Sequence, residues 1–279
     1  MASKLLTRTL VGVLFIAIFL ACLLHQYAFM AAMAFVIVVM HIEYYDMAVG
    51  RGSYCIEKVL AGATSLAMFL GVFSWKLWGF DVKWMLLGTL PFFVCCASLV
   101  FDRKERGEVR KTENILFPVL YVGLSSALGS LLLFDRNGVF DARLFLSIFI
   151  LIWMSDVGAY VLGIGFGQRP DSRKLCPDIS PHKSWIGVFG GLLFVCAAAV
   201  VLKLAGWFAM GWGHVVAIAL LVLVCGILGD LFESLIKRHW GVKDSGRIMP
   251  GHGGLLDRFD SALAVLPVVA VYMILFELI

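Results

Sequence analysis

The stretch WIGVFGGLLFVCAAAVVLKLAG, residues 185–206, decides the class of fold. It contains a single charged side chain, Lys203, close to its end. A helix over this stretch would be about 33 Å long at 1.5 Å per residue, which matches the roughly 30 Å hydrocarbon core of a bilayer. We therefore predict that residues 185–206 cross a membrane as a helix.

Eight other segments of the chain have the same character. Of the 279 residues, 61% are hydrophobic and 15% are charged, whereas soluble domains are about half apolar and about a quarter charged. A soluble fold could not bury this much apolar surface, so we predict an all-α, polytopic membrane protein with about nine transmembrane helices. The predicted spans are 6–24, 27–42, 58–75, 84–101, 114–134, 143–166, 185–206, 212–236 and 261–279.

The predicted organisation is one integral membrane domain, residues 1–279, with N-terminal helices in 1–135 and catalytic helices and loops in 136–279. The first apolar stretch could be a signal peptide, but no small-residue cleavage site follows it, which favours a retained helix. The seven cysteines are odd in number and lack C-x-x-C spacing, so they predict neither a disulfide framework nor a zinc site. Three histidines stand near predicted span ends and are expected at the membrane interface: His25, His41 and His214.

The basic residues predict the orientation of the chain. With nine spans and a cytoplasmic N-terminus, 18 of the 23 Lys and Arg residues fall on the cytoplasmic side, as the positive-inside rule requires. The polar segments 168–187 and 230–260 fall on the same side, as does the charged loop 102–113, so we expect a polar cavity that faces the cytoplasm. The net charge of +4 is too small to indicate a nucleic-acid partner.

The first polar motif is GDLFESLIKR, residues 229–238, which continues the eighth apolar run and is predicted to be helical. Its polar residues recur at helical spacing and share one face. Such a stripe indicates either a functional surface or a solvated helix end, and the motif alone does not decide between the two. The residues of the stripe are Asp230, Glu233, Ser234, Lys237 and Arg238.

The second motif is KDSGRIMPGHGG, residues 243–254. Pro250 and the three glycines that follow within four residues exclude a regular helix and permit positive φ. Successive N–H groups in such a loop can form a concavity for phosphate oxygens, and Lys243, Arg247 and Arg258 would add positive charge. The alternative is a plain turn between helices.

The third motif is LDRFDS, residues 256–261, at the start of the ninth span. Asp257, Asp260 and Ser261 would share one helix face. Capping of the helix N-terminus accounts for one of the acids, most readily Asp260, but less well for both. Carboxylate oxygens beside a phosphate-binding loop are what Mg²⁺–nucleotide chemistry requires.

Residues 234–260 together resemble the signature of the phosphatidate cytidylyltransferase family. The matched pattern covers 27 residues without a gap, and Asp230 in Gly-Asp-x-x-x-Ser also fits. The resemblance implies transfer of CMP from CTP to phosphatidate, which gives CDP-diacylglycerol and pyrophosphate in phospholipid biosynthesis. The pattern is Ser234-x-x-Lys237-Arg238, then Lys243-Asp244-x-Gly246, then Pro250-Gly251-His252-Gly253-Gly254-x-x-Asp257-Arg258-x-Asp260.

Two earlier segments resemble the family less closely. Asp156 lies inside a predicted span, where a carboxylate is costly and commonly functional; the alternative is a protonated acid that is hydrogen-bonded within the bundle. Residues 180–187, SPHKSWIG, resemble the family's Ser-Pro-x-Lys-Thr-x-Glu-Gly. Lys183 and Ser184 keep the cation and the hydroxyl, but Ile186 stands where the family commonly has glutamate. The role of that glutamate is therefore absent here or taken by another acid.

The resemblance gives each candidate residue an expected role. Asp230 and Asp257 would hold Mg²⁺, with Asp244 as a third or water-mediated ligand and with room for a second, monovalent cation. The loop at 251–254 would bind the triphosphate together with Lys243 and Arg258. Either the lipid phosphate or the leaving pyrophosphate would be held by Lys183, Lys237 and Arg238. The predicted catalytic residues are Asp230, Asp244, Asp257, Lys237 and Arg238. The predicted substrate-binding residues are Lys183, Ser180, Ser184, Asp156, Ser234, Lys243, Gly251, His252, Gly253, Gly254, Arg258 and Asp260.

The expected partners are CTP and phosphatidate as substrates and the lipid bilayer as solvent, with a homodimer expected only by analogy with the fold family. The expected location is a bacterial inner membrane, with the active site facing the cytoplasm. Another CTP-dependent lipid nucleotidyltransferase or a lipid kinase on the same fold stays open as an alternative. A transporter is less favoured, because the chain has no internal repeat.

Overall fold

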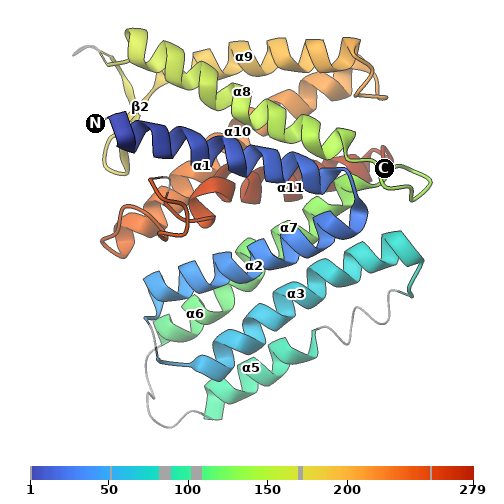
Figure 1. Cartoon of the computed structure of the whole chain (residues 1–279), viewed down its shortest axis with the longest axis vertical. Coiled ribbons are helices and arrows are strands. Elements are labelled where there is room, and N and C mark those ends of the chain that lie inside the picture. The colour runs from blue at the N-terminus through green and yellow to red at the C-terminus, as the bar shows by residue number, and fades with distance from the viewer. Residues whose placement is uncertain (1, 51, 82–88, 102–108, 169–171, 252) are drawn as a thin grey trace. The chain divides into compact units, whose positions relative to one another are not determined.

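The computed structural model describes the chain except for residues 1, 51, 82–88, 102–108, 169–171 and 252. The regular secondary structure of the described part is helical apart from one short hairpin (Figure 1). The helices are α1 (Ala2–Leu23), α2 (Gln26–Ala48), α3 (Cys55–Trp78), α5 (Leu90–Phe101), α6 (Val109–Pro118), the π-helix η1 (Val119–Leu124), α7 (Ser125–Ser130), the 3₁₀-helix η2 (Leu131–Leu133), α8 (Arg143–Phe166), α9 (Trp185–Leu204), α10 (Trp212–His239) and α11 (Leu256–Leu275). The antiparallel strands of the hairpin are β1 (Lys174–Cys176) and β2 (Ser180–Ser184).

Seven helical stretches in the described residues are long and apolar enough to cross a membrane. The prediction of an all-α, polytopic membrane protein is therefore confirmed in this coarser form. Two further apolar helices are shorter, Thr9–Leu23 and Leu90–Leu99. The seven are α2, α3, the continuous stretch Thr112–Leu133, α8, α9, α10 and α11.

The structure differs from the sequence prediction in three elements. The hairpin was not predicted, because its strands of three and five residues show no apolar alternation. Helix α2 continues beyond the predicted end at residue 42 to Ala48, since the polar residues that follow the apolar run are buried rather than solvated. Of the charged loop predicted at 102–113, residues 102–108 lie outside the described part, and 109–113 belong to α6.

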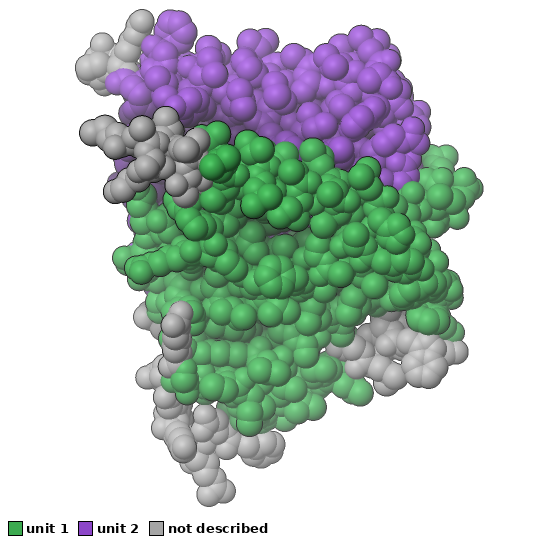
Figure 2. Space-filling model, viewed as in Figure 1, with its two compact units in different colours: residues 1–140, 240–259 green, residues 141–239, 260–279 purple. Residues whose placement is uncertain are grey.

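The chain divides into two compact units (Figure 2). Unit 1 comprises residues 1–140 and 240–259, and unit 2 comprises residues 141–239 and 260–279. The boundary near the C-terminus therefore falls inside α11. The grouping of residues 1–135 and 136–279 follows sequence order and stays a prediction.

In unit 1, α3 packs against α2, α5, α6 and α7, and Figure 1 shows α2, α3 and α6 side by side. His41 lies in this core with 3% of its surface exposed. Its Nδ1 is 2.9 Å from the Ile37 carbonyl oxygen and its Nε2 is 2.9 Å from the Ser65 hydroxyl. The interfacial placement predicted for His41 was therefore wrong, because α2 does not end there and the ring hydrogen-bonds to the neighbouring helix.

In unit 2, α8 and α9 pack along each other and α10 packs against both. Gly158 of α8 and Gly190 of α9 face each other so closely that a Cβ atom on either would collide with the backbone carbonyl of the other. Small residues allow this approach, which is a common way for helices to associate in membranes. The Ser261 hydroxyl of α11 donates to the Gly226 carbonyl of α10 across 3.2 Å.

The close approach of α8 and α9 gives a prediction for stability. Gly158→Val should lower the thermal unfolding temperature in detergent, because the added methyl groups must force two backbones apart, and overpacking costs about 1–3 kcal/mol. Gly165→Val is the matched control, since it makes the same change in α8 at a position with open space around it. Unfolding can be monitored by tryptophan fluorescence. Equal unfolding temperatures for the two variants would contradict the packing described.

Candidate functional site

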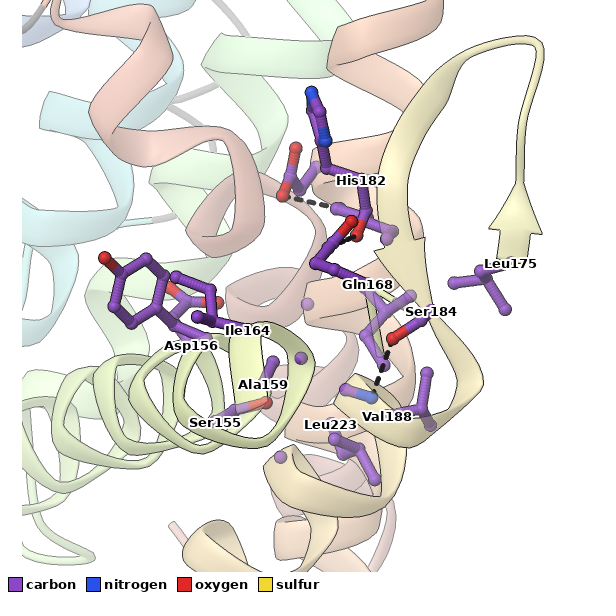
Figure 3. A pocket seen from close by; sticks show the side chains of 18 residues that line it. Ser155, Asp156, Ala159, Ile164, Gln168, Leu175, His182, Ser184, Val188 and Leu223 are labelled. Carbon is purple, nitrogen blue, oxygen red and sulfur yellow. Dashed lines mark hydrogen bonds and ion pairs between the residues drawn. The ribbon is translucent and has the colours of Figure 1, made fainter. Parts of the chain in front are cut away.

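Unit 2 contains a cavity of about 740 Å³ that is lined by α8, α9, α10 and the hairpin (Figure 3). Most of its lining is apolar, contributed by residues such as Ala159, Ile164, Val188 and Leu223. Three charged side chains interrupt this lining. They are Asp156 of α8, Lys183 of β2 and Asp230 of α10.

Lys183 and Asp230 form an ion pair at this cavity, with 2.5 Å between Nζ and Oδ2. Their side chains are 27% and 35% exposed, so the pair is partly screened by solvent and partly held in apolar surroundings. The Ser234 hydroxyl, one turn further along α10, donates to Asp230 Oδ1 across 3.4 Å. The predicted residues Lys183, Asp230 and Ser234 are thus brought together by the fold.

The hairpin holds Lys183 in place from both sides. After it, Ser184 is the N-cap of α9, because its Oγ accepts a hydrogen bond of 3.2 Å from the Gly187 N–H. Before it, the His182 carbonyl accepts a hydrogen bond of 3.0 Å from the Gln168 side chain. Lys183 therefore sits on a short strand that is fixed to α9 at one end and to the end of α8 at the other.

Acidic groups outnumber lysines in this part of unit 2. Glu233 is 1% exposed and pairs with Lys237 in α10, with 2.5 Å between Oε2 and Nζ. Asp260 of α11 interacts electrostatically with Asp230 and Asp156, as well as with Lys237. Sequence analysis placed Glu233 on the polar stripe but not among the site residues; its burial, which only the fold reveals, marks it as part of this charge network.

This donor set fits a divalent cation. Carboxylate oxygens are the ligands that Mg²⁺ prefers, and Mg²⁺ commonly uses only one or two protein carboxylates together with substrate phosphates. The acids that outnumber the lysines in unit 2 could supply such carboxylates. Within the described residues, no group of three or more Asp, Glu, His and Cys side chains is close enough to form a metal site by itself.

Unit 1 contains the glycine loop, and two carboxylates organise it. Asp257 accepts hydrogen bonds from the Ser245 N–H (2.9 Å to Oδ2) and the Gly254 N–H (2.8 Å). Glu43 of α2 accepts hydrogen bonds from the Leu255 N–H at 3.0 Å and the Leu256 N–H at 2.9 Å. These backbone groups form the N-terminus of α11, so Glu43 acts as its cap. Asp260, the residue predicted for this role, lies one turn further along the helix.

Glu43 was not predicted as a site residue. It is 6% exposed and lies more than 200 residues before its hydrogen-bond partners. In the sequence it directly follows the apolar run 27–42, and a glutamate there is typical of the end of a span. The signal that could have marked it is the continuation of aromatic residues, Tyr44 and Tyr45, beyond it.

The glycines of the loop have a different local role from the one predicted. A Cβ atom at Gly246 or Gly254 would collide with the Glu43 carboxylate. At Gly253, which has φ of +82°, a Cβ atom would be 2.5 Å from Asp257 Oδ2. The N–H of Gly254, predicted to bind phosphate, is engaged by Asp257. The glycines therefore make room for protein carboxylates within unit 1.

The basic side chains on and beside the loop are accessible to solvent. Lys243, Arg247 and Arg258 are exposed, and so is Asp244. A cavity of about 880 Å³ lies between this loop and α2, within unit 1. It is lined by Val39, Ile42, Glu43, Asp46, Met47 and residues 242–248.

The predicted site residues are divided between the two units. Asp230 and Asp257, the two expected metal ligands, fall in different units, so their convergence stays a prediction; His252 lies outside the described residues. Unit 1 holds Lys243, Asp244, Gly251, Gly253, Gly254, Asp257 and Arg258. Unit 2 holds Asp156, Ser180, Lys183, Ser184, Asp230, Ser234, Lys237, Arg238 and Asp260.

Comparisons with known proteins agree on one family. A family model described as "Cytidylyltransferase family" matches residues 6–276. A phosphatidate cytidylyltransferase of Staphylococcus epidermidis is 36% identical over 189 residues, which is 68% of this chain and 69% of the relative. One of Staphylococcus aureus is 39% identical over 173 residues (61% and 62%), and one of Bacillus subtilis is 44% identical over 128 residues (46% of each).

The glycine loop gives a prediction that a matched pair of variants can test. Gly253→Ala and Gly241→Ala both place a Cβ atom at positive φ, which costs about 1–2 kcal/mol. Only Gly253→Ala also presses that atom against the Asp257 carboxylate, because Gly241 has open space around it. We expect a lower unfolding temperature for Gly253→Ala than for Gly241→Ala. Indistinguishable melting curves would contradict the contact between Gly253 and Asp257.

Proposed function

The chain belongs to the cytidylyltransferase family, and on this premise we propose that it transfers the CMP group of CTP to phosphatidate, giving CDP-diacylglycerol and pyrophosphate. The observation that carries the proposal is the family match over residues 6–276, which includes the whole signature at 234–260. The relatives named above carry the name of this activity.

The cavity of unit 2 supports a role in binding phosphatidate. This lipid has a charged phosphate on an apolar body, and the cavity combines a mostly apolar lining with the ammonium group of Lys183. The lipid phosphate would replace Asp230 as the anionic partner of Lys183. Lys237 is less suited to this step, because it is 12% exposed and is paired with the buried Glu233.

The glycine loop of unit 1 supports a role in binding the nucleotide. Lys243, Arg247 and Arg258 are exposed side chains on or beside this loop and would attract a triphosphate. The loop is held by Asp257 and Glu43 through hydrogen bonds to its backbone. It can therefore present these cations without first having to fold, which lowers the entropic cost of binding.

The reaction needs charge neutralisation more than covalent chemistry. An anionic phosphate oxygen of phosphatidate attacks the α-phosphorus of CTP, a new P–O bond forms, and the bond to the β-phosphate breaks to release pyrophosphate. The attacking oxygen is already ionised at neutral pH, so no general base is required. The residues of the site contribute by orienting two anions that repel each other and by offsetting their charge.

We assign Mg²⁺ to Asp230 and Asp257, with Asp244 as a third or water-mediated ligand and with room for a monovalent cation. When bound, Mg²⁺ would neutralise phosphate charge and polarise the α-phosphoryl group. Asp260 interacts electrostatically with both Asp230 and Asp156. Ser180 and Ser184 belong to the wall beside Lys183, and Arg238 is an exposed cation at the end of α10 that could hold the leaving pyrophosphate.

The proposal includes nine spans in a bacterial inner membrane, with the polar cavity facing the cytoplasm. The seven long helices and the two shorter apolar ones supply the spans, and 18 of 23 basic residues favour this orientation. Labelling of a cysteine at Lys104 but not at Lys83 by an impermeant reagent on intact cells would exclude the orientation. A homodimer is also proposed, by analogy with the family, and light scattering in detergent would test it.

The test of the function is to incubate the purified protein in detergent with phosphatidate, Mg²⁺ and CTP that is labelled at the α- or the γ-phosphate. Label from the α-position in a lipid nucleotide supports the proposal. Label from the γ-position in a lipid phosphate would instead identify the alternative, a CTP-dependent lipid kinase. Absence of any labelled lipid, with both substrates present, would count against both activities toward phosphatidate.

The assignment of the carboxylates gives a prediction for kinetics. Asp230→Asn and Asp257→Asn keep the side-chain shape but remove a charge, and each should lower the rate by at least about two orders of magnitude. The double variant should be little slower than either single variant, because both residues would act through one metal ion. Turnover of the three variants as a function of Mg²⁺ concentration is the measurement, at matched thermal stability.

Near-wild-type turnover in one of the single variants would remove that residue from the set of essential ligands. Losses that multiply in the double variant would show that the two carboxylates act at separate places.

A further inference from the structure

Glu43 makes contacts that a simple span end would not make. Its Oε1 accepts a hydrogen bond from the Leu255 N–H and its Oε2 accepts one from the Leu256 N–H. The Ser245 hydroxyl donates to Oε2 from the opposite side of the loop, across 3.5 Å. One buried carboxylate of α2 thus binds both ends of the segment 245–256, which Asp257 also joins through the Ser245 and Gly254 N–H groups.

The segment is shaped around this carboxylate. Gly246 and Gly254 are the positions at which a side chain would occupy the space of the Glu43 carboxylate. Both lie in the family signature that the sequence contains. Neither residue has a positive φ, so the turn itself does not require glycine at these two positions. The space taken by the Glu43 carboxylate does require it.

Glu43 and Asp257 divide the backbone N–H groups of the segment between them. The Gly254 N–H donates to Asp257, and the next two N–H groups donate to Glu43. Ser245 binds both acids, since its N–H donates to Asp257 and its hydroxyl to Glu43. A displacement of the Glu43 carboxylate would therefore move the backbone that orients Asp257.

We propose that Glu43 is a positioning residue for nucleotide use: it holds the segment 245–256 so that Asp257 and the basic side chains of the loop are presented to CTP. This inference rests on the proposed function. Glu43 also lines the 880 Å³ cavity of unit 1 together with Lys243 and Arg247, so α2 forms the wall opposite the loop cations. The N-terminal helices thereby contribute to a site whose signature lies entirely in the last fifth of the chain.

The test compares Glu43→Gln with Glu57→Gln. Glutamine keeps the size of the side chain, but its NH₂ group would face one of the N–H donors of α11 and could not accept from it. Glu57 is the control, because it also accepts a hydrogen bond between helices of unit 1, from Ser98, and does not line the cavity beside the loop. We expect Glu43→Gln to lower kcat/KM for CTP at least about tenfold, with the KM for phosphatidate little changed, and Glu57→Gln to leave both near wild type.

Hydrogen exchange of peptides that cover residues 243–256 provides a second measurement that needs no substrate. We expect faster exchange there in Glu43→Gln and unchanged exchange in Glu57→Gln. Ser245→Ala is the milder variant should Glu43→Gln fail to fold, since it leaves the contacts of Glu43 with Leu255 and Leu256 in place and should shift both measurements in the same direction by less.

Three results would overturn the proposal. Faster exchange with unchanged CTP kinetics would reduce Glu43 to a helix cap. Equal losses toward CTP and phosphatidate would indicate general destabilisation, and unchanged exchange with unchanged kinetics would show that the carboxylate holds nothing. If the wild-type protein makes no CDP-diacylglycerol, the proposed function falls, whereas the exchange comparison still decides whether Glu43 orders the loop.

Discussion

The start of a buried helix leaves backbone N–H groups without partners, and water does not reach them where the surrounding residues are buried, as Leu255 and Leu256 are. In this chain the carboxylate of Glu43 meets that need for α11. A neutral acceptor would also satisfy an N–H group, but a carboxylate forms stronger hydrogen bonds and favours the positive end of the helix dipole. Burial of such a charge is costly unless it is fully hydrogen-bonded, so the loop must fold closely around it. The glycines at 246 and 254 are a consequence of that requirement.

The same reasoning applies to the charged groups of unit 2. Lys183 pairs with Asp230 and Lys237 pairs with Glu233, each in surroundings that are largely apolar. A pair of this kind contributes little to stability, because the cost of removing both charges from water offsets most of their attraction. Its value lies in keeping charges at a fixed place beside an apolar cavity. Under the proposed function, a phosphate group that enters the cavity would find Lys183 already partly desolvated, and the carboxylate of Asp230, once displaced, would become available to another cation.

The sequence predicted the parts of the fold that depend on local pattern. The apolar runs gave the long helices, and the spacing of Asp230, Ser234 and Lys237 gave the polar face of α10. The contacts of Glu43 could not be predicted, because they join residues more than 200 positions apart and depend on packing that no local pattern encodes. His41 was assigned to the interface for the same reason: its partner, Ser65, lies on another helix. The hairpin escaped prediction because its strands are too short to show a period.

The backbone of the glycine loop was predicted from the motif, but the group that contacts this backbone was not. Positive φ and close backbone approach were expected, and Gly253 has both. The group that approaches the backbone within unit 1, however, is a protein carboxylate. Asp257 and Glu43 already accept from the N–H groups of residues 245 and 254–256. Under the proposed function, phosphate recognition at this part of the loop would therefore fall to the side chains of Lys243, Arg247 and Arg258. Charged side chains adapt to several phosphate geometries, whereas a ring of backbone N–H groups fits only one. The buried carboxylates of Glu43 and Asp257 would then fix the shape of the loop. The exposed cations would bind the triphosphate while it is converted into CDP-diacylglycerol and pyrophosphate.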